Sequence, residues 1–233
     1  MLPNKTARYC RRGCALLVFL MLWPCFALNC KAQTMVYHSV PTESNKIALT
    51  FDDGPHPSQT HRILDILEKY GVKATFFMIG VNVHNYPDAA REVISRGHEV
   101  GNHTYSHICP KNLSESGLAK ELERCEDALE DLCEYRPHLF RPPEGVLNAY
   151  VQHCSERGDY SLILWSVDTR DWAVKNAEVI AERVLSKVQP GDIVLMHDYI
   201  ANSKTPEALE ILLPKLLALG FEPVTVSELL GVG

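Results

Sequence analysis

The 233-residue sequence predicts a single α/β domain in which parallel strands form a closed or nearly closed barrel with helices outside. From about residue 46, short β-rich runs alternate with longer runs of helical spacing. Glycine follows several of the helical runs, as a helix C-cap does, and no Pro/Gly/Ser-rich linker divides the chain. Hydrophobic residues make up 46% of the sequence and charged residues 22%, which is ordinary for a soluble globular protein.

The first strand–helix–strand unit shows the pattern most clearly. Residues 46–51 and 74–79 are β-rich, and residues 61–70 between them carry apolar side chains at helical spacing, closed by Gly71. About seven such units follow one another, which indicates a closed or nearly closed barrel. The remaining strands are expected at 98–102, 139–141, 160–167, 192–196 and 222–226, and the remaining helices at 86–96, 114–132, 148–157, 176–188 and 205–219.

The first 32 residues differ in kind from the rest. Four basic side chains precede an apolar run over 14–28, and residues 1–32 contain no acid, which is the order of a secretory signal. The apolar run is about 15 residues long, shorter than the ~20 that a membrane-spanning helix needs. We therefore expect a signal peptide or an N-terminal anchor over 1–32, a folded domain over 33–233, and a secreted or cell-envelope location. Membrane association is expected only if the N-terminal segment stays uncleaved.

The charge of the chain argues against a nucleic-acid partner. Without residues 1–32 the chain loses five of its 23 basic residues, so 18 remain against 29 acidic ones, a formal net charge of −11. Nucleic-acid binding depends on neutralising phosphates with Lys and Arg, which this balance disfavours. An uncharged sugar polymer is not disfavoured in this way. We further expect the protein to be a monomer.

Eight cysteines leave the redox state open. Four lie in the first 32 residues, and the others are Cys109, Cys125, Cys133 and Cys154. The later four contain no Cys-x-x-Cys pair, which argues against a cysteine zinc site. Cys125 and Cys133 fall on one predicted helix about 12 Å apart, which is too far for a disulfide. A bridge involving Cys109 or Cys154 and four free thiols are both compatible with the sequence.

Side chains suited to metal-dependent hydrolysis gather where predicted strands end. Asp52 and Asp53 follow the first strand and precede Gly54-Pro55. Adjacent side chains on a strand point to opposite faces, so these two acids share a pocket only if the strand has already ended. The alternative is an acid pair in a turn that caps the next helix.

His103 and His107 stand four residues apart, after the strand predicted at 98–102. On a helical turn this spacing would place both imidazoles on one side, which suits a divalent metal ion. Histidine pairs of this kind also occur as ordinary surface or core residues, so the spacing alone does not establish a site.

Three further strand ends carry candidate residues. Arg141 is followed by two prolines that fix the backbone, so we expect its guanidinium to be held for a bidentate contact to a carboxylate. Asp168 and Asp171 precede Trp172, a side chain that can stack on a sugar ring or serve the core. His197 ends a strongly apolar strand. Each has an ordinary structural explanation alone, but five strand ends that each supply an acid, a base or a ligand argue for one shared site.

Together these strings resemble the motifs of the polysaccharide deacetylase (NodB-homology) family, also called carbohydrate esterase family 4, over roughly residues 40–230. The matching strings are TFDDGP at 50–55, HTYSH at 103–107, RPPEG at 141–145, DTRDW at 168–172 and LMHD at 195–198. The resemblance implies a distorted (β/α) barrel of about seven parallel strands and metal-dependent removal of acetyl groups from N-acetylated sugars. Residues 33–233 would then be a catalytic domain.

The resemblance implies roles for the metal-binding and proton-transferring residues. Asp53, His103 and His107 correspond to the metal ligands, with Zn²⁺ expected and Co²⁺, Mn²⁺ or Ni²⁺ as alternatives. Asp52 corresponds to the catalytic base and Arg141 to the residue that orients it.

The resemblance also implies an acid and a substrate groove. Asp171 corresponds to the residue that holds and tunes His197, the general acid, while Asp168 has a supporting role. Trp172 and Leu195 correspond to walls of the acetyl-binding groove. A backbone N–H near Glu144 would stabilise the oxyanion. The family commonly has an aromatic residue in place of Glu144, a departure that bears on substrate preference more than on catalysis.

The C-terminal motifs look most like those of exported bacterial peptidoglycan N-acetylglucosamine deacetylases, which act outside the membrane. Peptidoglycan is therefore the expected polysaccharide partner, with chitooligosaccharide deacetylases and acetylxylan esterases as alternatives. A non-catalytic wall-binding relative would be expected to have lost the base, a ligand or the acid, and none is substituted here. Two histidines and one carboxylate also describe the metal triad of iron oxygenases, but the additional Asp52 and His197 argue against that class.

Overall fold

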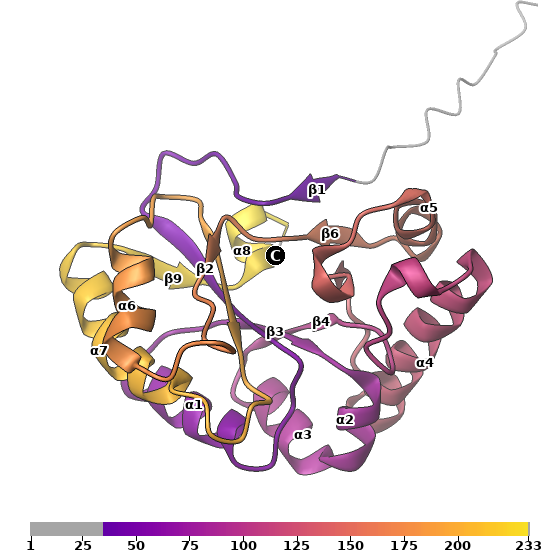
Figure 1. Cartoon of the computed structure of the whole chain (residues 1–233), viewed down its shortest axis with the longest axis horizontal. Coiled ribbons are helices and arrows are strands. Elements are labelled where there is room, and N and C mark those ends of the chain that lie inside the picture. Colours follow the sequence, from indigo (N-terminus) through magenta and orange to yellow (C-terminus); the bar gives the residue numbers. More distant parts are fainter. Residues whose placement is uncertain (1–34, 233) are drawn as a thin grey trace, which may run out of the picture. The chain divides into compact units, whose positions relative to one another are not determined.

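The computed structural model describes residues 35–232, which form one parallel sheet curled into a half-barrel with helices around it (Figure 1). The signal segment expected over 1–32 lies outside the described residues. Strands pair in the order β1-β6-β5-β4-β3-β2-β8-β7, and β9 pairs with β2. Every strand pair is parallel. The predicted α/β barrel is confirmed. β1 and β7 are the first and last strands of this order.

The structure has nine strands in residues 35–232. They are β1 Val36–Tyr37, β2 Lys46–Asp52, β3 Thr75–Met78, β4 Glu99–Asn102, β5 Leu139–Phe140, β6 Ser161–Ile163, β7 Val167–Asp168, β8 Ile193–His197 and β9 Glu222–Val224. The α-helices are α1 Gln59–Lys69, α2 Gly80–Asn85, α3 Pro87–Ser95, α4 Glu115–Cys133, α5 Ala149–Gly158, α6 Ala177–Leu185, α7 Thr205–Ala218 and α8 Val226–Leu230.

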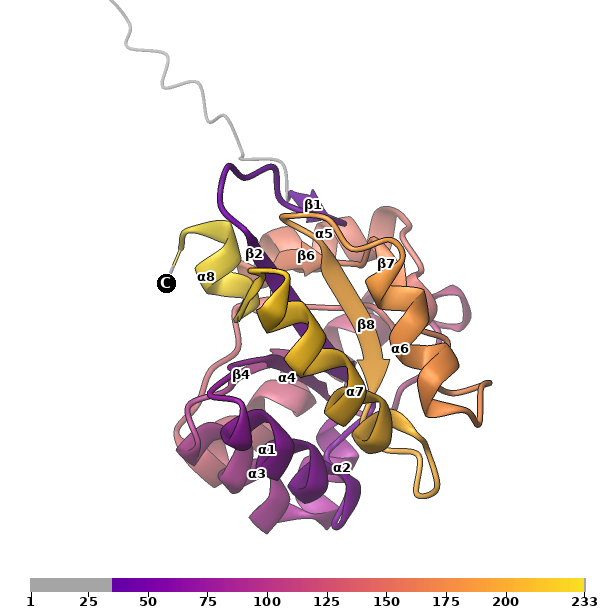
Figure 2. The same cartoon turned by 90° about the vertical axis from the view of Figure 1, so that its left-hand side faces the viewer.

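The longest strand, β2, organises the sheet. It pairs with β3, β8 and β9, and Figure 2 shows β8 running alongside it. Its alternate residues Ile47, Leu49 and Phe51 are fully buried in the larger core cluster, against the outer helices. The intervening Thr50 and Asp52 therefore point to the inner side of the half-barrel, where the site lies.

Helices cover the outer side of this half-barrel. In Figure 1, α1, α3, α2 and α4 follow one another along its lower edge, while α6 and α7 pack together at the left. Polar residues define where several of these helices begin, because each accepts a hydrogen bond from a backbone N–H of the first turn. These N-caps are Ser114 of α4, Asn148 of α5, Asn176 of α6 and Thr225 of α8.

One predicted strand is divided in two, and another ends earlier than expected. The run 160–167 is divided into β6 and β7, because the carbonyls of Ile163 and Leu164 accept hydrogen bonds from the Arg141 side chain, at 3.2 and 2.9 Å. The run 222–226 stops at Val224, since Thr225 caps α8 instead. The short elements β1 and α2 were not expected from the sequence pattern. α2 starts directly after β3 without a side-chain cap.

The cysteines of the described part are free thiols. None of Cys109, Cys125, Cys133 and Cys154 is bridged, and α4 carries both Cys125 and Cys133 as expected. Between residues 35 and 232, none of the helices combines the length and the apolar character needed to cross a bilayer.

The packing of β2 predicts a large loss of stability for Phe51→Ala. The Phe51 ring is fully buried and stacks on Phe76 with ring centroids 4.9 Å apart. Removing a buried ring leaves a cavity, so the free energy of unfolding should fall by about 3–5 kcal/mol in denaturant titrations. The exposed Leu219→Ala, by contrast, should change it by less than about 0.5 kcal/mol. Equal losses in the two variants would contradict the assigned core.

Candidate active site

The carboxyl ends of the parallel strands meet at one edge of the sheet, and the predicted site residues gather there. β2 ends at Asp52, β7 at Asp168 and β8 at His197, while His103 follows β4. These ends surround a cavity of about 370 Å³. Its walls are formed by Asp52, Asp53, His103, His107, Glu144, Trp165, Asp168, Trp172, Leu195 and His197. A larger hollow of about 460 Å³ on α6 and α7 contains none of these side chains.

The three predicted metal ligands lie together. Ligand atoms of Asp53, His103 and His107 all fall within 4.8 Å of one another. Asp53 Oδ1 is 3.4 Å from His103 Nε2 and 3.2 Å from His107 Nε2. His103 Nδ1 lies 2.6 Å from the carbonyl oxygen of Arg141. Because a carbonyl oxygen can only accept, Nδ1 carries the proton and the lone pair of Nε2 faces the cavity.

Left-handed backbone conformations create this convergence. Asp53 has φ 75°, which turns the chain directly after β2 and lets Asp52 and Asp53 face one cavity. Thr104 and His107 have φ 66° and 56°, and the His107 N–H donates to Thr104 Oγ1 at 3.2 Å. The expected helical turn between the two histidines is therefore wrong. A right-handed helix cannot contain such residues, and a reversed loop brings the imidazoles together instead.

The electrostatics of this group suit a divalent cation. Asp53 Oδ1 is buried and has no hydrogen-bond partner within residues 35–232. Burial alone would raise the pKa of Asp53, but the imidazoles of His103 and His107 hold it well below its usual range. The same contact with Asp53 raises the pKa of His107. A buried carboxylate oxygen without a partner, facing two imidazole nitrogens, fits the ligand set of Zn²⁺.

Arg141 is fully buried and holds Asp52 in place. Its Nη1 donates to Asp52 Oδ1 at 2.7 Å and to Thr50 Oγ1 at 2.8 Å. The expected bidentate contact is wrong, because Nε and Nη2 donate to carbonyl oxygens of the β6 end instead. Burial lowers the pKa of Arg141, and the Asp52 carboxylate opposes that shift. The second carboxylate oxygen of Asp52 stays free toward the cavity, 3.8 Å from His103 Nε2.

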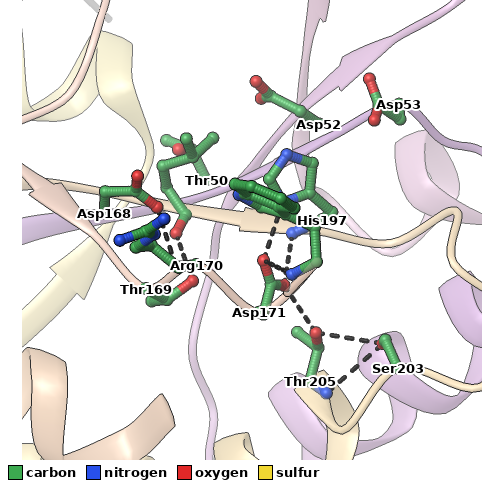
Figure 3. Close-up of polar contacts among 12 residues, drawn as sticks. Thr50, Asp52, Asp53, Asp168, Thr169, Arg170, Asp171, His197, Ser203 and Thr205 are labelled. Atoms are coloured by element: carbon green, nitrogen blue, oxygen red, sulfur yellow. Dashed lines mark hydrogen bonds and ion pairs between the residues drawn. The ribbon is translucent and has the colours of Figure 1, made fainter. Parts of the chain in front are cut away.

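His197 is held on the other side of the cavity by Asp171. Figure 3 shows Asp52 and Asp53 on one side of the imidazole and Asp171 on the other. His197 Nδ1 lies 2.7 Å from Asp171 Oδ1, and the His197 N–H donates to Asp171 Oδ2 at 2.8 Å. Thr205 Oγ1 also donates to Oδ2, at 2.6 Å. Burial would lower the pKa of His197, but the Asp171 carboxylate outweighs burial and raises it to about 9.

The predicted substrate-binding residues lie at the same cavity. Trp172 is 55% exposed, so its ring is available to a ligand, whereas Leu195 is buried in the wall. Glu144 stands in a tight turn with φ 59°, and its carboxylate accepts a hydrogen bond from Cys109 Sγ at 3.3 Å. Glu144 lies in the cavity wall, where the family resemblance leads us to expect a backbone donor for the oxyanion.

Sequence reasoning missed three residues of this region. Trp165 lines the cavity. Because successive side chains of a strand point to opposite faces, the strand expected at 160–167 carried a signal that Trp165 points inward. Asp198 is buried beside Gly54, where an added Cβ would lie 2.2 Å from its carboxylate oxygens. Burial raises the pKa of Asp198 to about 7. Thr205, which fixes Asp171, begins a helix and carries no local signal of that role.

Comparison with known proteins identifies the family. The family model described as polysaccharide deacetylase matches residues 39–163. The chain belongs to the polysaccharide deacetylase family. It is 42% identical over 194 residues to a peptidoglycan-N-acetylglucosamine deacetylase of Bacillus cereus, covering 82% of this chain and 91% of that protein. The matched family segment ends before β8, so His197 lies beyond it.

Solved structures of this family share the fold. A peptidoglycan N-acetylglucosamine deacetylase superimposes with a TM-score of 0.81 at 33% identity, covering 84% of this chain and 92% of that one. A family pseudoenzyme from Bacillus anthracis superimposes with a TM-score of 0.80 at 32% identity, covering 85% and 70%. Because a pseudoenzyme superimposes almost as well as an enzyme, the individual side chains and not the shared fold distinguish the two.

The contact with Asp171 predicts how His197 titrates. With a pKa near 9, the imidazole stays protonated through neutral pH and loses its proton as the pH rises through about 9. The contact thus stabilises the fold fully below the unfolded pKa of about 6.5, and this contribution is lost as the pH rises through the folded value. Asp171→Asn removes the charge while burial remains, so we expect the His197 pKa to fall by at least about 1 unit.

NMR titration of the His197 ring in the metal-free protein measures this shift. Asp168→Asn is the matched control, because it neutralises another carboxylate of the cavity wall that is not bonded to His197. It should leave the His197 titration nearly unchanged. A His197 pKa that is equal in wild type and Asp171→Asn would contradict the assigned role of Asp171.

Proposed function

We propose that the protein removes N-acetyl groups from N-acetylglucosamine units of a cell-wall polysaccharide, with peptidoglycan as the principal substrate. The observation that carries the proposal is the composition of one cavity. It contains a ligand trio, a carboxylate base held by a buried arginine, and a histidine acid on the opposite side. None of these groups is replaced, and the similar Bacillus cereus protein is named for the same reaction.

Asp53, His103 and His107 would hold the catalytic cation, for which we propose Zn²⁺, with Co²⁺, Mn²⁺ or Ni²⁺ as substitutes. One carboxylate and two neutral imidazoles leave a divalent ion with net positive charge. When bound, such an ion polarises the acetyl carbonyl and lowers the pKa of a coordinated water.

The other residues move protons and stabilise charge. The free oxygen of Asp52 accepts a proton from the attacking water, and Arg141 keeps this carboxylate oriented. We assign oxyanion binding to the Glu144 N–H, because Glu144 lines the cavity. His197, protonated at neutral pH because of Asp171, donates a proton to the departing amine. Asp171 keeps the imidazole in the required orientation through its contact to Nδ1.

The cavity also suits a sugar. The exposed ring of Trp172 can stack on a pyranose, and the apolar Leu195 beside it suits an acetyl methyl group. The wall contains four acidic side chains and three histidines but no Lys or Arg. This lining favours an uncharged N-acetylated sugar over a phosphorylated one. We also propose that the protein is exported, as the expected signal segment indicates, and that it is a monomer.

Acetate release from a panel of polymers tests the proposal. Purified protein with added Zn²⁺ would be assayed on peptidoglycan, chitopentaose and acetylxylan. We expect the highest kcat/KM on peptidoglycan, and a loss of activity with a chelator that Zn²⁺ restores. Preference for chitopentaose or acetylxylan would overturn the substrate assignment. Release from none of the three with any divalent metal would instead favour a wall-binding relative.

Mutation should distinguish the roles of the two neighbouring acids, Asp52 and Asp53. Asp52→Asn keeps the size of the base and leaves the ligand trio intact, so Zn²⁺ binding should persist while kcat falls by about 10²–10⁴-fold. The exposed Asp88→Asn is the matched control and should change neither quantity. Isothermal titration with Zn²⁺ and initial rates on peptidoglycan measure the two effects. Loss of Zn²⁺ binding in Asp52→Asn would show that the roles of Asp52 and Asp53 are exchanged.

A further inference from the structure

Behind the metal ligands, a buried amide fixes the loop that carries them. Asn102 ends β4 directly before His103 and is fully buried. Its Nδ2 donates to the Leu122 carbonyl at 3.0 Å and to the Tyr160 hydroxyl at 2.9 Å. Its Oδ1 accepts the Thr104 N–H at 2.8 Å. Both amide hydrogens and the amide oxygen are therefore used, and none of these contacts reaches the cavity.

The residue that Asn102 holds is in an unfavourable conformation. Thr104 is β-branched and fully buried, and its φ of 66° lies in the left-handed region that such residues avoid. A conformation of this kind persists only where several contacts impose it. Three contacts do so here: the Thr104 N–H donates to Asn102, its carbonyl accepts from Gly80 N at 3.0 Å, and its Oγ1 accepts from His107 N.

This reversed turn decides where the second imidazole points. With Thr104 in a right-handed conformation, His107 would leave the position at which its Nε2 lies 3.2 Å from Asp53. The Asn102 side chain is therefore linked to the ligand geometry through one hydrogen bond. The Tyr160 hydroxyl, which accepts from the Asn102 amide, donates in turn to Glu126 on α4. This hydrogen bond therefore connects Asn102 to α4 and not to the metal ligands.

We infer that Asn102 is a positioning residue for the metal centre, because its Oδ1 holds Thr104 in the left-handed conformation that brings His107 toward Asp53 and His103. Asn102 itself would not touch the cation or the substrate. The inference rests on the metal site of the proposed function.

Asn102→Ala and Tyr160→Phe separate positioning from general stability. Each removes one partner of the same buried hydrogen bond, but only Asn102→Ala frees the Thr104 N–H. Zn²⁺ affinity would be measured by competition with a chelating dye, and ligand geometry by the visible spectrum of the Co²⁺ form. We expect Asn102→Ala to weaken Zn²⁺ binding by about 10–100-fold and to alter the Co²⁺ spectrum. Tyr160→Phe should stay within about threefold of wild type, with an unchanged spectrum.

Two results would overturn the inference. One is Zn²⁺ binding by Asn102→Ala within about threefold of wild type, and the other is an equal loss in Tyr160→Phe, which would indicate general loosening. If Asn102→Ala does not fold, Asn102→Asp serves instead, because it keeps the oxygen that accepts from Thr104. It should retain Zn²⁺ binding within about tenfold, and a greater loss would contradict the inference. Wild-type protein that binds no divalent ion would overturn the proposed function as well.

Discussion

The buried side chain of Arg141 connects β2 to the end of β6, and its backbone contacts the end of β4. The side chain of Arg141 is 0% exposed, and it donates to Thr50 and Asp52 on β2 and to carbonyls at the end of β6. Its backbone accepts from His103 and donates to Asn102 at the end of β4. An unpaired buried charge is strongly unfavourable, so arginine and carboxylate each require the other. The base and one metal ligand are thereby fixed by a single residue.

Contacts that form only in the folded chain, such as those of Arg141, limit which parts of the structure could be predicted from sequence. Alternating strand and helix patterns identified the parallel sheet, and the polar residues at strand ends identified the edge where Asp52, His103 and His197 meet. The reversed turns at Asp53 and Thr104 could not be predicted, because buried hydrogen bonds that form only in the folded chain impose them, such as those of Thr104 with Asn102 and Gly80, rather than the intrinsic preference of the residue. The division of the strand over 160–167 was hidden for the same reason, since Arg141 is distant in sequence from the carbonyls that it binds.

The site also shows how neighbouring acids acquire different tasks. Asp52 and Asp53 are adjacent in sequence, yet one faces a fixed guanidinium and the other faces two imidazoles. A third acid, Asp171, faces His197 and a threonine hydroxyl. These surroundings, rather than the carboxyl groups themselves, distinguish a proton acceptor, a metal ligand and a partner for an acid.

The parallel pairing of the nine strands has a consequence for how the chain acquires its structure. A parallel neighbour is never made by a local hairpin, and β2 obtains its partners β8 and β9 from the last quarter of the sequence. Asp52 and His197, paired in register on β2 and β8, therefore meet only after nearly all of the polypeptide is available. Contacts so distant along the chain make folding slow and leave an unpaired apolar strand exposed meanwhile. During biosynthesis, β2 would thus need protection from mispairing until the segment bearing His197 emerges.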